Sequence, residues 1–193
     1  MDLHSLAAFG DQVALSQFKP DDTISALSFS CDGQFLASGD QAGRVVVFKL
    51  NGKNAQNTQV SFVTQVHAHK PQFDYFRSEL SEMKVNSLKW VPVQKINPLL
   101  ITCNSHDAKL WEFDATPKNS WDQFDNNQTI DSFVFPTASK SDTKYSYQCL
   151  KTFTDIQTEY IVDLQCLSDQ HSFLMVDVGC VKLWDIERDV TPV

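Results

Sequence analysis

The sequence predicts an all-β protein that folds as part of a β-propeller, and the first observation is a six-residue phrase that occurs three times. The phrase is clearest at residues 181–186 (VKLWDI), and it returns at 108–113 (AKLWEF) and, with Phe in place of Trp, at 45–50 (VVVFKL). Each copy alternates side chains that suit the two faces of a strand, and each carries a large aromatic that can wedge against a neighbouring sheet. Such a recurrence is typical of a repeat architecture.

The second observation is that the same order of parts precedes each phrase: an alternating strand, a turn, and a short apolar strand. The three alternating strands are expected at 24–29, 85–90 and 161–166, and the short apolar strands at 35–39, 99–102 and 172–176. Three antiparallel strands per unit, with a fourth in the connection, make the WD-repeat blade of a β-propeller. The sequence therefore predicts four-stranded antiparallel blades.

The repeat also sets the expected boundaries of a partial propeller within residues 1–193. We expect blade 1 at about 13–50, blade 2 at about 60–113, a projecting hairpin or connection at about 115–154, and blade 3 at about 158–187. The repeated aromatics lie farther apart than in plain WD repeats of roughly 40–45 residues, so both connections should carry additional structure.

The composition argues against several classes of partner and compartment. The formal net charge is −8 at pH 7, whereas nucleic acid or an anionic membrane surface would need a basic stripe to neutralise its phosphates. No secretory leader opens the sequence, no apolar run is long enough to span a bilayer, and the five cysteines show no CxxC spacing. We expect a soluble cytoplasmic or nuclear protein that binds other proteins, with no bound cofactor.

The stretch around residues 73–86 resembles one family in particular, the 55 kDa regulatory B subunits of the type 2A serine/threonine protein phosphatase. Residues 36–40 (LASGD) and 43–48 (GRVVVF) also lie close to that family's pattern. In the family's signature around the insertion, the matching residues of this sequence are Phe73, Asp74, Tyr75, Ser78, Glu82, Lys84 and Asn86. A second family signature, near the start of the third blade, is largely lost here, with Thr158, Ile161, Ser168 and Asp169 surviving.

The resemblance implies a seven-bladed WD-repeat fold, of which this sequence covers about three blades, as in a divergent and truncated member. It implies a non-catalytic subunit that docks on the phosphatase scaffold, associates with the catalytic subunit, and presents an acidic face to phosphoprotein substrates with basic residues near their phosphosites. The connection at about 115–154 would correspond to a hairpin that reaches towards the scaffold. The candidate partner-binding residues are Phe73, Asp74, Tyr75, Arg77, Glu82, Trp121 and Asp177.

Three acidic residues, Asp40, Asp107 and Asp177, lie in the turns before the three repeated phrases. Their distances from the following aromatic differ, which weakens the expected tight-turn role. Capping of the turn is favoured over substrate binding for these acids. Of the family's acidic pair in the third blade, only Asp177 remains here.

Two histidines and one tryptophan in the connections suggest other possible roles. His67 and His69 could hold a metal with Asp74 or with His106 and Asp107, but hydrogen bonding within the loop is favoured. Trp121, in a polar connection, is either an anchor for a partner or a local plug. No phosphate-binding loop, nucleophile elbow or cysteine with a base partner is present in the sequence.

Three hypotheses for function follow from these observations. The first is a regulatory, substrate-selecting subunit of a type 2A phosphatase holoenzyme. The alternative is a generic WD-repeat interaction scaffold without phosphatase association, and the third, disfavoured, is an enzyme that uses His67 and His69.

Overall fold

The fold is described from a computed structural model, which describes residues 19–51, 59–74, 78–92, 97–114, 146–154 and 160–188. A short 3-10 helix, η2 (Pro20–Asp22), precedes the first strand, and antiparallel strands make up the regular structure that follows. The strands are β1 (Ile24–Phe29), β2 (Phe35–Asp40), β3 (Arg44–Asn51), β4 (Gln59–His67), β5 (Phe73–Asp74), β6 (Glu79–Leu80), β7 (Ser87–Trp90), β8 (Leu99–Cys103), β9 (Ala108–Phe113), β10 (Tyr147–Phe153), β11 (Ile161–Cys166), β12 (Ser172–Asp177) and β13 (Val181–Asp185).

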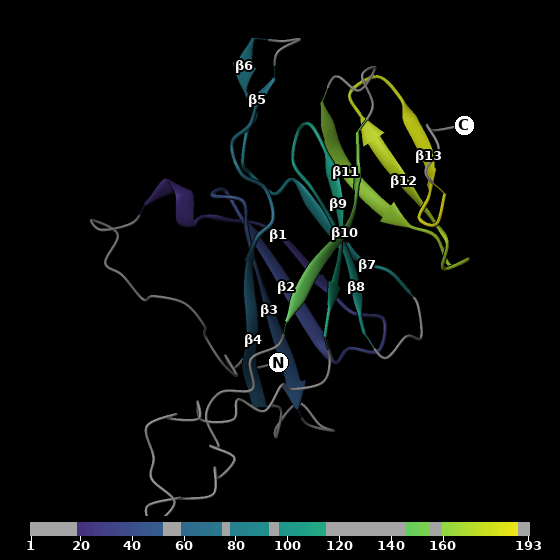
Figure 1. Ribbon diagram of the computed structural model, residues 1–193. Helices are drawn as coiled ribbons and strands as arrows, with labels where there is room; N and C mark the ends of the chain where they lie inside the picture. Colours follow the sequence, from purple (N-terminus) through teal and green to yellow (C-terminus); the bar gives the residue numbers. More distant parts are fainter. Residues whose placement is uncertain are drawn as a thin grey trace, which may run out of the picture.

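The strands form three blade-like sheets and one small hairpin. Blade 1 has the order β1-β2-β3-β4, blade 2 the order β7-β8-β9-β10, and blade 3 the order β11-β12-β13 within the described residues. The fourth sheet is the two-stranded hairpin β5-β6, which stands away from the blades in Figure 1. The prediction of an all-β fold made of antiparallel WD-type blades is confirmed, with four strands in each of blades 1 and 2.

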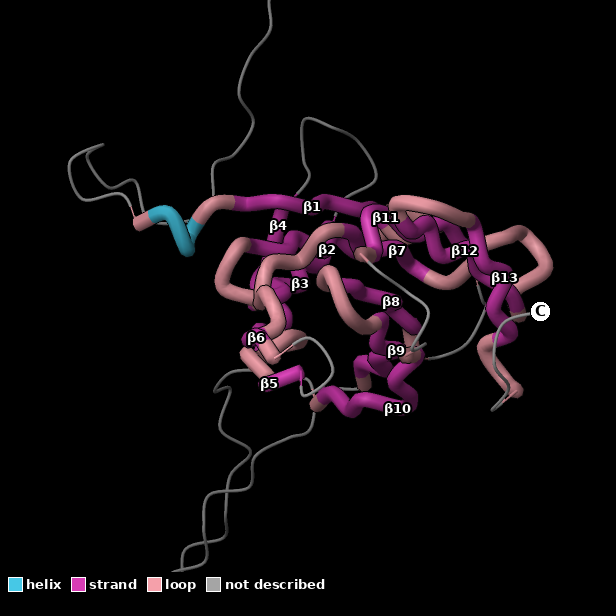
Figure 2. The backbone as a smooth tube through the Cα atoms, turned by 90° about the horizontal axis from the view of Figure 1, so that it is seen from above, coloured by secondary structure: helices cyan, strands magenta, loops and turns pink. Residues whose placement is uncertain are grey.

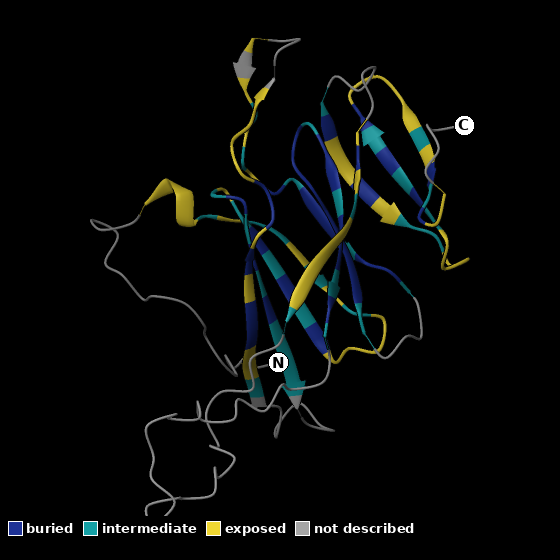
Figure 3. Ribbon diagram, viewed as in Figure 1, coloured by how far each residue is buried: buried dark blue, intermediate teal, exposed yellow. Residues whose placement is uncertain are grey.

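The blades pack side by side around their innermost strands. β1 contacts β7, and β7 contacts β11, so these three strands lie next to one another as seen from above in Figure 2. Two apolar cores fill the spaces between the blades. One lies between blades 1 and 2 and includes Val47, Leu88 and Trp111, and the other lies between blades 2 and 3 and includes Leu110 and Trp184. Figure 3 shows this buried material as the dark blue bands along the strands.

The strand pairing corrects two of the expected boundaries. β4, which was expected to open blade 2, pairs with β3 along its whole length and is the outer strand of blade 1. β10, which was expected in a projecting connection, pairs with β9 and is the outer strand of blade 2. In both cases the fourth strand of a sheet comes from the connection, which satisfies the backbone hydrogen bonds of an otherwise open edge. The expected start of blade 1, residues 13–18, and residues 115–145 of the expected connection lie outside the described residues.

Within the described residues, no helix is both long enough and apolar enough to cross a membrane.

Candidate protein-docking surface

Several strand connections gather at the end of the blades from which the β5-β6 hairpin projects (Figure 1), and we call it the hairpin end. They are the connections at 40–44, 67–86, 103–108 and 177–181. Hydrogen bonds between these loops tie the blades together, for example from Val85 N to Asp40 O at 3.0 Å and from Ile161 N to Ser105 O at 2.9 Å. The blades thus present these loops as one continuous surface.

A buried chain of hydrogen bonds joins blade 1 to blade 2 beneath this surface. The Trp111 indole N–H donates to Thr102 Oγ1 at 3.1 Å, and Thr102 Oγ1 lies 3.0 Å from His69 Nε2. The other ring nitrogen, His69 Nδ1, lies 2.9 Å from Asp107 Oδ1. Because the indole can only donate and the carboxylate can only accept, His69 carries its proton on Nδ1 and accepts the Thr102 hydroxyl at Nε2. Every member of the chain is then satisfied.

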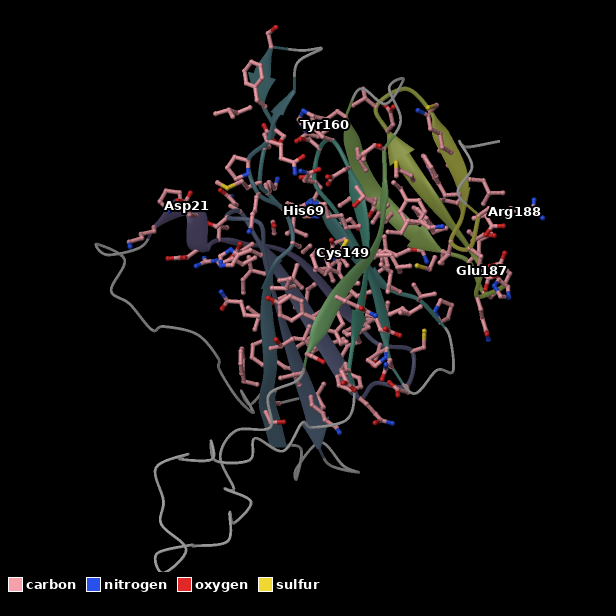
Figure 4. All side chains as sticks on the ribbon, in the orientation of Figure 1. Asp21, His69, Cys149, Tyr160, Glu187 and Arg188 are labelled. Atoms are coloured by element: carbon pink, nitrogen blue, oxygen red, sulfur yellow. The ribbon has the colours of Figure 1, made fainter. Side chains whose placement is uncertain are left out.

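Burial sets the protonation state of this chain. It lowers the pKa of His69 below its ordinary value, outweighing the hydrogen bond to Asp107, so the imidazole is neutral at pH 7. Burial acts to raise the pKa of Asp107, but its hydrogen bond with His69 and the nearby Lys109 ammonium overcome this and lower it. Lys109 Nζ lies 3.5 Å from Asp107 Oδ2 and donates to Ala68 O at 3.1 Å. Figure 4 shows His69 in the interior between the blades.

A glycine allows the loop that carries His69 to lie directly on blade 1. Gly43 has φ +77°, and its carbonyl accepts hydrogen bonds from the backbone N–H groups of Ala68 and His69. A Cβ at Gly43 would lie 2.1 Å from His69 O and 2.8 Å from Met83 O. Glycine is therefore required both for its backbone conformation and for the space it leaves.

Glu82 connects the hairpin end of blade 2 to blade 3. Its backbone carbonyl accepts a hydrogen bond from Asn104 Nδ2 at 3.0 Å, and its carboxylate accepts one from Tyr160 Oη at 3.1 Å. The Tyr160 pKa is raised, first by burial and then by the charge and hydrogen bond of Glu82. Within the described residues, the exposed Glu82 carboxylate has no cationic partner, and the same holds for Asp21 in η2. These two carboxylates supply negative charge at the hairpin end that no described cation neutralises through a salt bridge.

The β5-β6 hairpin carries two exposed apolar side chains beyond the body of the blades. Phe73 is 49% exposed and Leu80 65% exposed, and the two residues face each other in the strand register. The base of the hairpin is closed by Gln72 and Ser81, which exchange two hydrogen bonds. A large apolar pair on a projecting, anchored hairpin is suited to contact with a protein partner.

The predicted partner-binding residues are therefore only partly brought together. Phe73, the backbone of Asp74, and Glu82 lie at the hairpin end. Tyr75, Arg77 and Trp121 lie outside the described residues.

Asp177 also lies at the hairpin end, but it is buried and committed to its own turn. It accepts a hydrogen bond from Gly179 N at 3.0 Å, and its carboxylate lies 4.0 Å from Lys182 Nζ. Asp40 acts in the same way towards the backbone and guanidinium of Arg44. A partner contact through Asp177 stays a prediction.

The structure also shows what the sequence reasoning missed. Asp107 was set aside as a degenerate turn acid, yet it ends a hydrogen-bonded chain that crosses between two blades. Thr102 and Tyr160 were not singled out at all. The sequence did offer a signal. Thr102 lies in the strand that pairs with the strand of Trp111, and His69 lies in the connection that precedes these strands.

His69, one of the residues weighed for a metal site, is held by other contacts. Both ring nitrogens of His69 are engaged by protein groups. Across the part of the chain that the structure describes, no group of three or more His, Cys, Asp or Glu side chains is placed to hold a metal ion.

At the opposite end of blade 2, a polar pocket of about 410 Å³ lies where β9 ends and β10 begins. It is lined by Asn97, Glu112, Asp114, Ser146, Tyr147 and Gln148. The connection expected to reach the phosphatase scaffold starts and ends beside this pocket.

Comparison with known proteins assigns the relationship. The PP2A regulatory B subunit of Candida tropicalis is 29% identical over 96% of this chain. The gamma isoform of the 55 kDa regulatory B subunit of serine/threonine-protein phosphatase 2A from Mus musculus is 30% identical over 86% of it. This chain is similar in sequence to PP2A regulatory B subunits over most of its length. It spans only about 40% of the length of these relatives, and no family model matches it.

A comparison with solved structures supports the fold. Chaetomium thermophilum Sqt1 bound to the N-terminus of the ribosomal protein L10 matches with a TM-score of 0.53 at 17% identity, over 86% of this chain and 33% of that one. Sqt1 is a WD40 propeller, so the likeness confirms the blade architecture.

Proposed function

We propose that this chain is a non-catalytic regulatory subunit of a PP2A holoenzyme, which docks on the scaffold subunit and selects substrates for the catalytic subunit. The observation that carries the proposal is the relationship to the named regulatory B subunits along 86–96% of the chain. Four of the matched signature residues that the structure describes are exposed on the projecting hairpin or just below it: Phe73, Ser78, Glu82 and Lys84. On this proposal the protein works in the cytoplasm or nucleus, where its holoenzyme partners would be.

The two ends of the blades suggest a division of roles. The hairpin end offers apolar side chains at Phe73 and Leu80. It also offers the carboxylates of Asp21 and Glu82, which form no salt bridge within the described residues. These features fit a phosphoprotein with basic residues near its phosphosite. The opposite end, where the 115–145 connection leaves blade 2 beside the polar pocket, is the proposed side for the scaffold.

Reconstitution from purified components tests the docking step. The 193-residue chain should co-elute with the PP2A scaffold and catalytic subunits as one complex. The subunit interface should be insensitive to Phe73→Ala, because Phe73 lies at the hairpin end. If the folded chain fails to join the complex, the phosphatase proposal is wrong and the generic WD-repeat scaffold replaces it.

Substrate selection is tested with the reconstituted enzyme. For a phosphopeptide with basic flanks, Phe73→Ala should raise KM about tenfold and Glu82→Gln about threefold, with kcat unchanged, because these side chains contribute binding and no chemistry. Matched controls are Phe62→Ala on β4 and Glu187→Gln at the opposite end of blade 3, which should leave KM as it is. Equal effects of the test and control variants would remove the hairpin end from the proposal.

A further inference from the structure

A tyrosine from blade 3 holds the exposed carboxylate of Glu82. Tyr160 lies immediately before β11, and its hydroxyl donates a hydrogen bond to Glu82 Oε2 at 3.1 Å. Figure 4 shows Tyr160 at the hairpin end. Glu82 precedes it by 78 residues and lies between the β5-β6 hairpin and the first strand of blade 2. The contact therefore crosses the boundary between blades 2 and 3.

The backbone on both sides of this contact is fixed by other hydrogen bonds. The carbonyl of Glu82 accepts from Asn104 Nδ2 at 3.0 Å, and Asn104 is itself buried in blade 2. Next to Tyr160, the carbonyl of Ile161 accepts from Asn86 Nδ2 at 2.7 Å. Both partners are thus carried by backbone that is anchored between the blades, which restricts where the Glu82 carboxylate can lie.

The donor is neutral, and this decides what the contact leaves on the surface. The pKa of Tyr160 is raised, first by burial and also by the charge and hydrogen bond of Glu82, so the hydroxyl keeps its proton at pH 7. A lysine or arginine could also hold Glu82, but its charge would neutralise the carboxylate. The Tyr160 hydroxyl occupies Oε2, and Oε1 can accept from a cationic group. The carboxylate is therefore oriented without losing its negative charge.

Orientation matters for a side chain as long as that of glutamate. An exposed Glu82 that rotated freely would lose rotamer freedom on binding a partner, which weakens binding by a factor of about two to ten. The hydrogen bond from Tyr160 removes part of that freedom before any partner binds. Since Glu82 forms no salt bridge within the described residues, a basic side chain from outside can pair with it.

We propose that Tyr160 is a positioning residue for substrate selection, which fixes the Glu82 carboxylate at the boundary between blades 2 and 3 as the acceptor for one basic side chain of the substrate. The proposal rests on the proposed function, in which Glu82 binds basic residues near a phosphosite. It adds a residue of blade 3 to a site otherwise made by the hairpin end of blade 2.

Direct peptide binding measures the effect of Tyr160 without the phosphatase. The probe is a phosphopeptide with arginines beside the phosphosite, and its control peptide has glutamines at those positions. In isothermal titration calorimetry on the purified protein, Tyr160→Phe should weaken binding of the arginine peptide about two- to threefold, and no more than Glu82→Gln does. Binding of the glutamine peptide should not change. Tyr160→Phe removes only the hydroxyl, and far-UV circular dichroism should show it folded.

A double variant tests whether Tyr160 acts through Glu82. Tyr160→Phe combined with Glu82→Gln should bind the arginine peptide as Glu82→Gln alone does, because no charge is left to position. The matched control is Tyr147→Phe, which removes a hydroxyl at the opposite end of blade 2 and should leave both peptides' affinities unchanged. In the reconstituted enzyme, Tyr160→Phe should raise KM for the arginine peptide by the same factor, with kcat unchanged.

The outcomes separate this inference from the proposed function. If Glu82→Gln weakens binding of the arginine peptide and Tyr160→Phe does not, the role of Tyr160 is wrong and that of Glu82 stands. If neither variant changes binding, Glu82 does not contact the basic residues, and the roles of both residues are wrong. Equal weakening by Tyr160→Phe with and without Glu82→Gln would also overturn the inference, because Tyr160 would then act independently of Glu82.

Discussion

The two blade interfaces inside this chain use the same repeat positions but different chemistry. Between blades 1 and 2, Trp111 hydrogen-bonds to Thr102 in a buried polar chain that ends at Asp107. Between blades 2 and 3, Met175 takes the position of Thr102, and the buried indole N–H of Trp184 has no hydrogen-bond partner among the described residues. The repeat therefore fixes where the aromatic lies, while the neighbouring residues decide whether the interface is polar or apolar.

Aromatic packing occupies the second interface in place of the polar chain. Phe153 packs edge-on against both Phe173 and Trp184, with ring centroids 4.9 Å and 5.6 Å away. Such pairs stabilise beyond the area they bury, by about 0.5–1.5 kcal/mol each. Leaving a buried N–H without a hydrogen bond costs about 1–3 kcal/mol, and the aromatic pairs offset this cost at Trp184.

The largest expected effect comes from the glycine beneath the polar interface. Gly43→Ala should lower the free energy of unfolding by at least about 3 kcal/mol, because the new methyl meets the His69 and Met83 carbonyls and the backbone φ is unfavourable. Gly179→Ala is the matched control in blade 3, since nothing lies within 4 Å of a Cβ there. Urea unfolding of both variants measures the difference, and similar losses would contradict the close approach.

A reciprocal exchange of side chains tests the interface chemistry. Thr102→Val should cost about 2–3 kcal/mol, because it leaves the Trp111 N–H and His69 Nε2 buried without partners. Met175→Thr should be at least as stable as Met175→Val, although a buried hydroxyl normally costs more than a methyl, because the new hydroxyl can accept from Trp184. If Met175→Val is clearly more stable than Met175→Thr, a hydrogen-bond acceptor at position 175 does not stabilise the Trp184 N–H.

The polar interface should also make stability depend on pH. The His69 pKa is lowered from its ordinary 6.5, so below about pH 6.5 the unfolded chain binds more protons and the free energy of unfolding falls as pH falls. The slope is at most about 1.4 kcal/mol per pH unit. Asp107, whose pKa is lowered from its ordinary 3.8, stabilises above that value, and the contribution is lost only below it.

Chemical unfolding between pH 7 and 5 measures this slope. His69→Gln is the comparison, because it removes the titrating group and retains hydrogen-bonding capacity. Its slope should be smaller by the contribution of His69. If the free energy of unfolding has the same slope against pH in the wild type and in His69→Gln, a group other than His69 causes the pH dependence.

The blades were predictable because strand alternation and the repeated aromatics are local in sequence. The outer strands β4 and β10 were assigned to the wrong neighbours, because pairing depends on which edge is open once the sheet has formed. The link from His69 to Thr102 and Asp107 was also missed. It joins residues more than 30 positions apart, and hydrogen bonds of this kind depend on how the blades pack against each other.

The most direct test of this account is a double-mutant cycle between His69 and Thr102, with His69→Leu and Thr102→Val measured alone and together. The two side chains meet only if blades 1 and 2 pack as described, with Thr102 Oγ1 3.0 Å from His69 Nε2. We predict a coupling free energy of about 1–2 kcal/mol. Additive losses, with a coupling free energy near zero, would contradict the packing of the two blades and the polar chain between them.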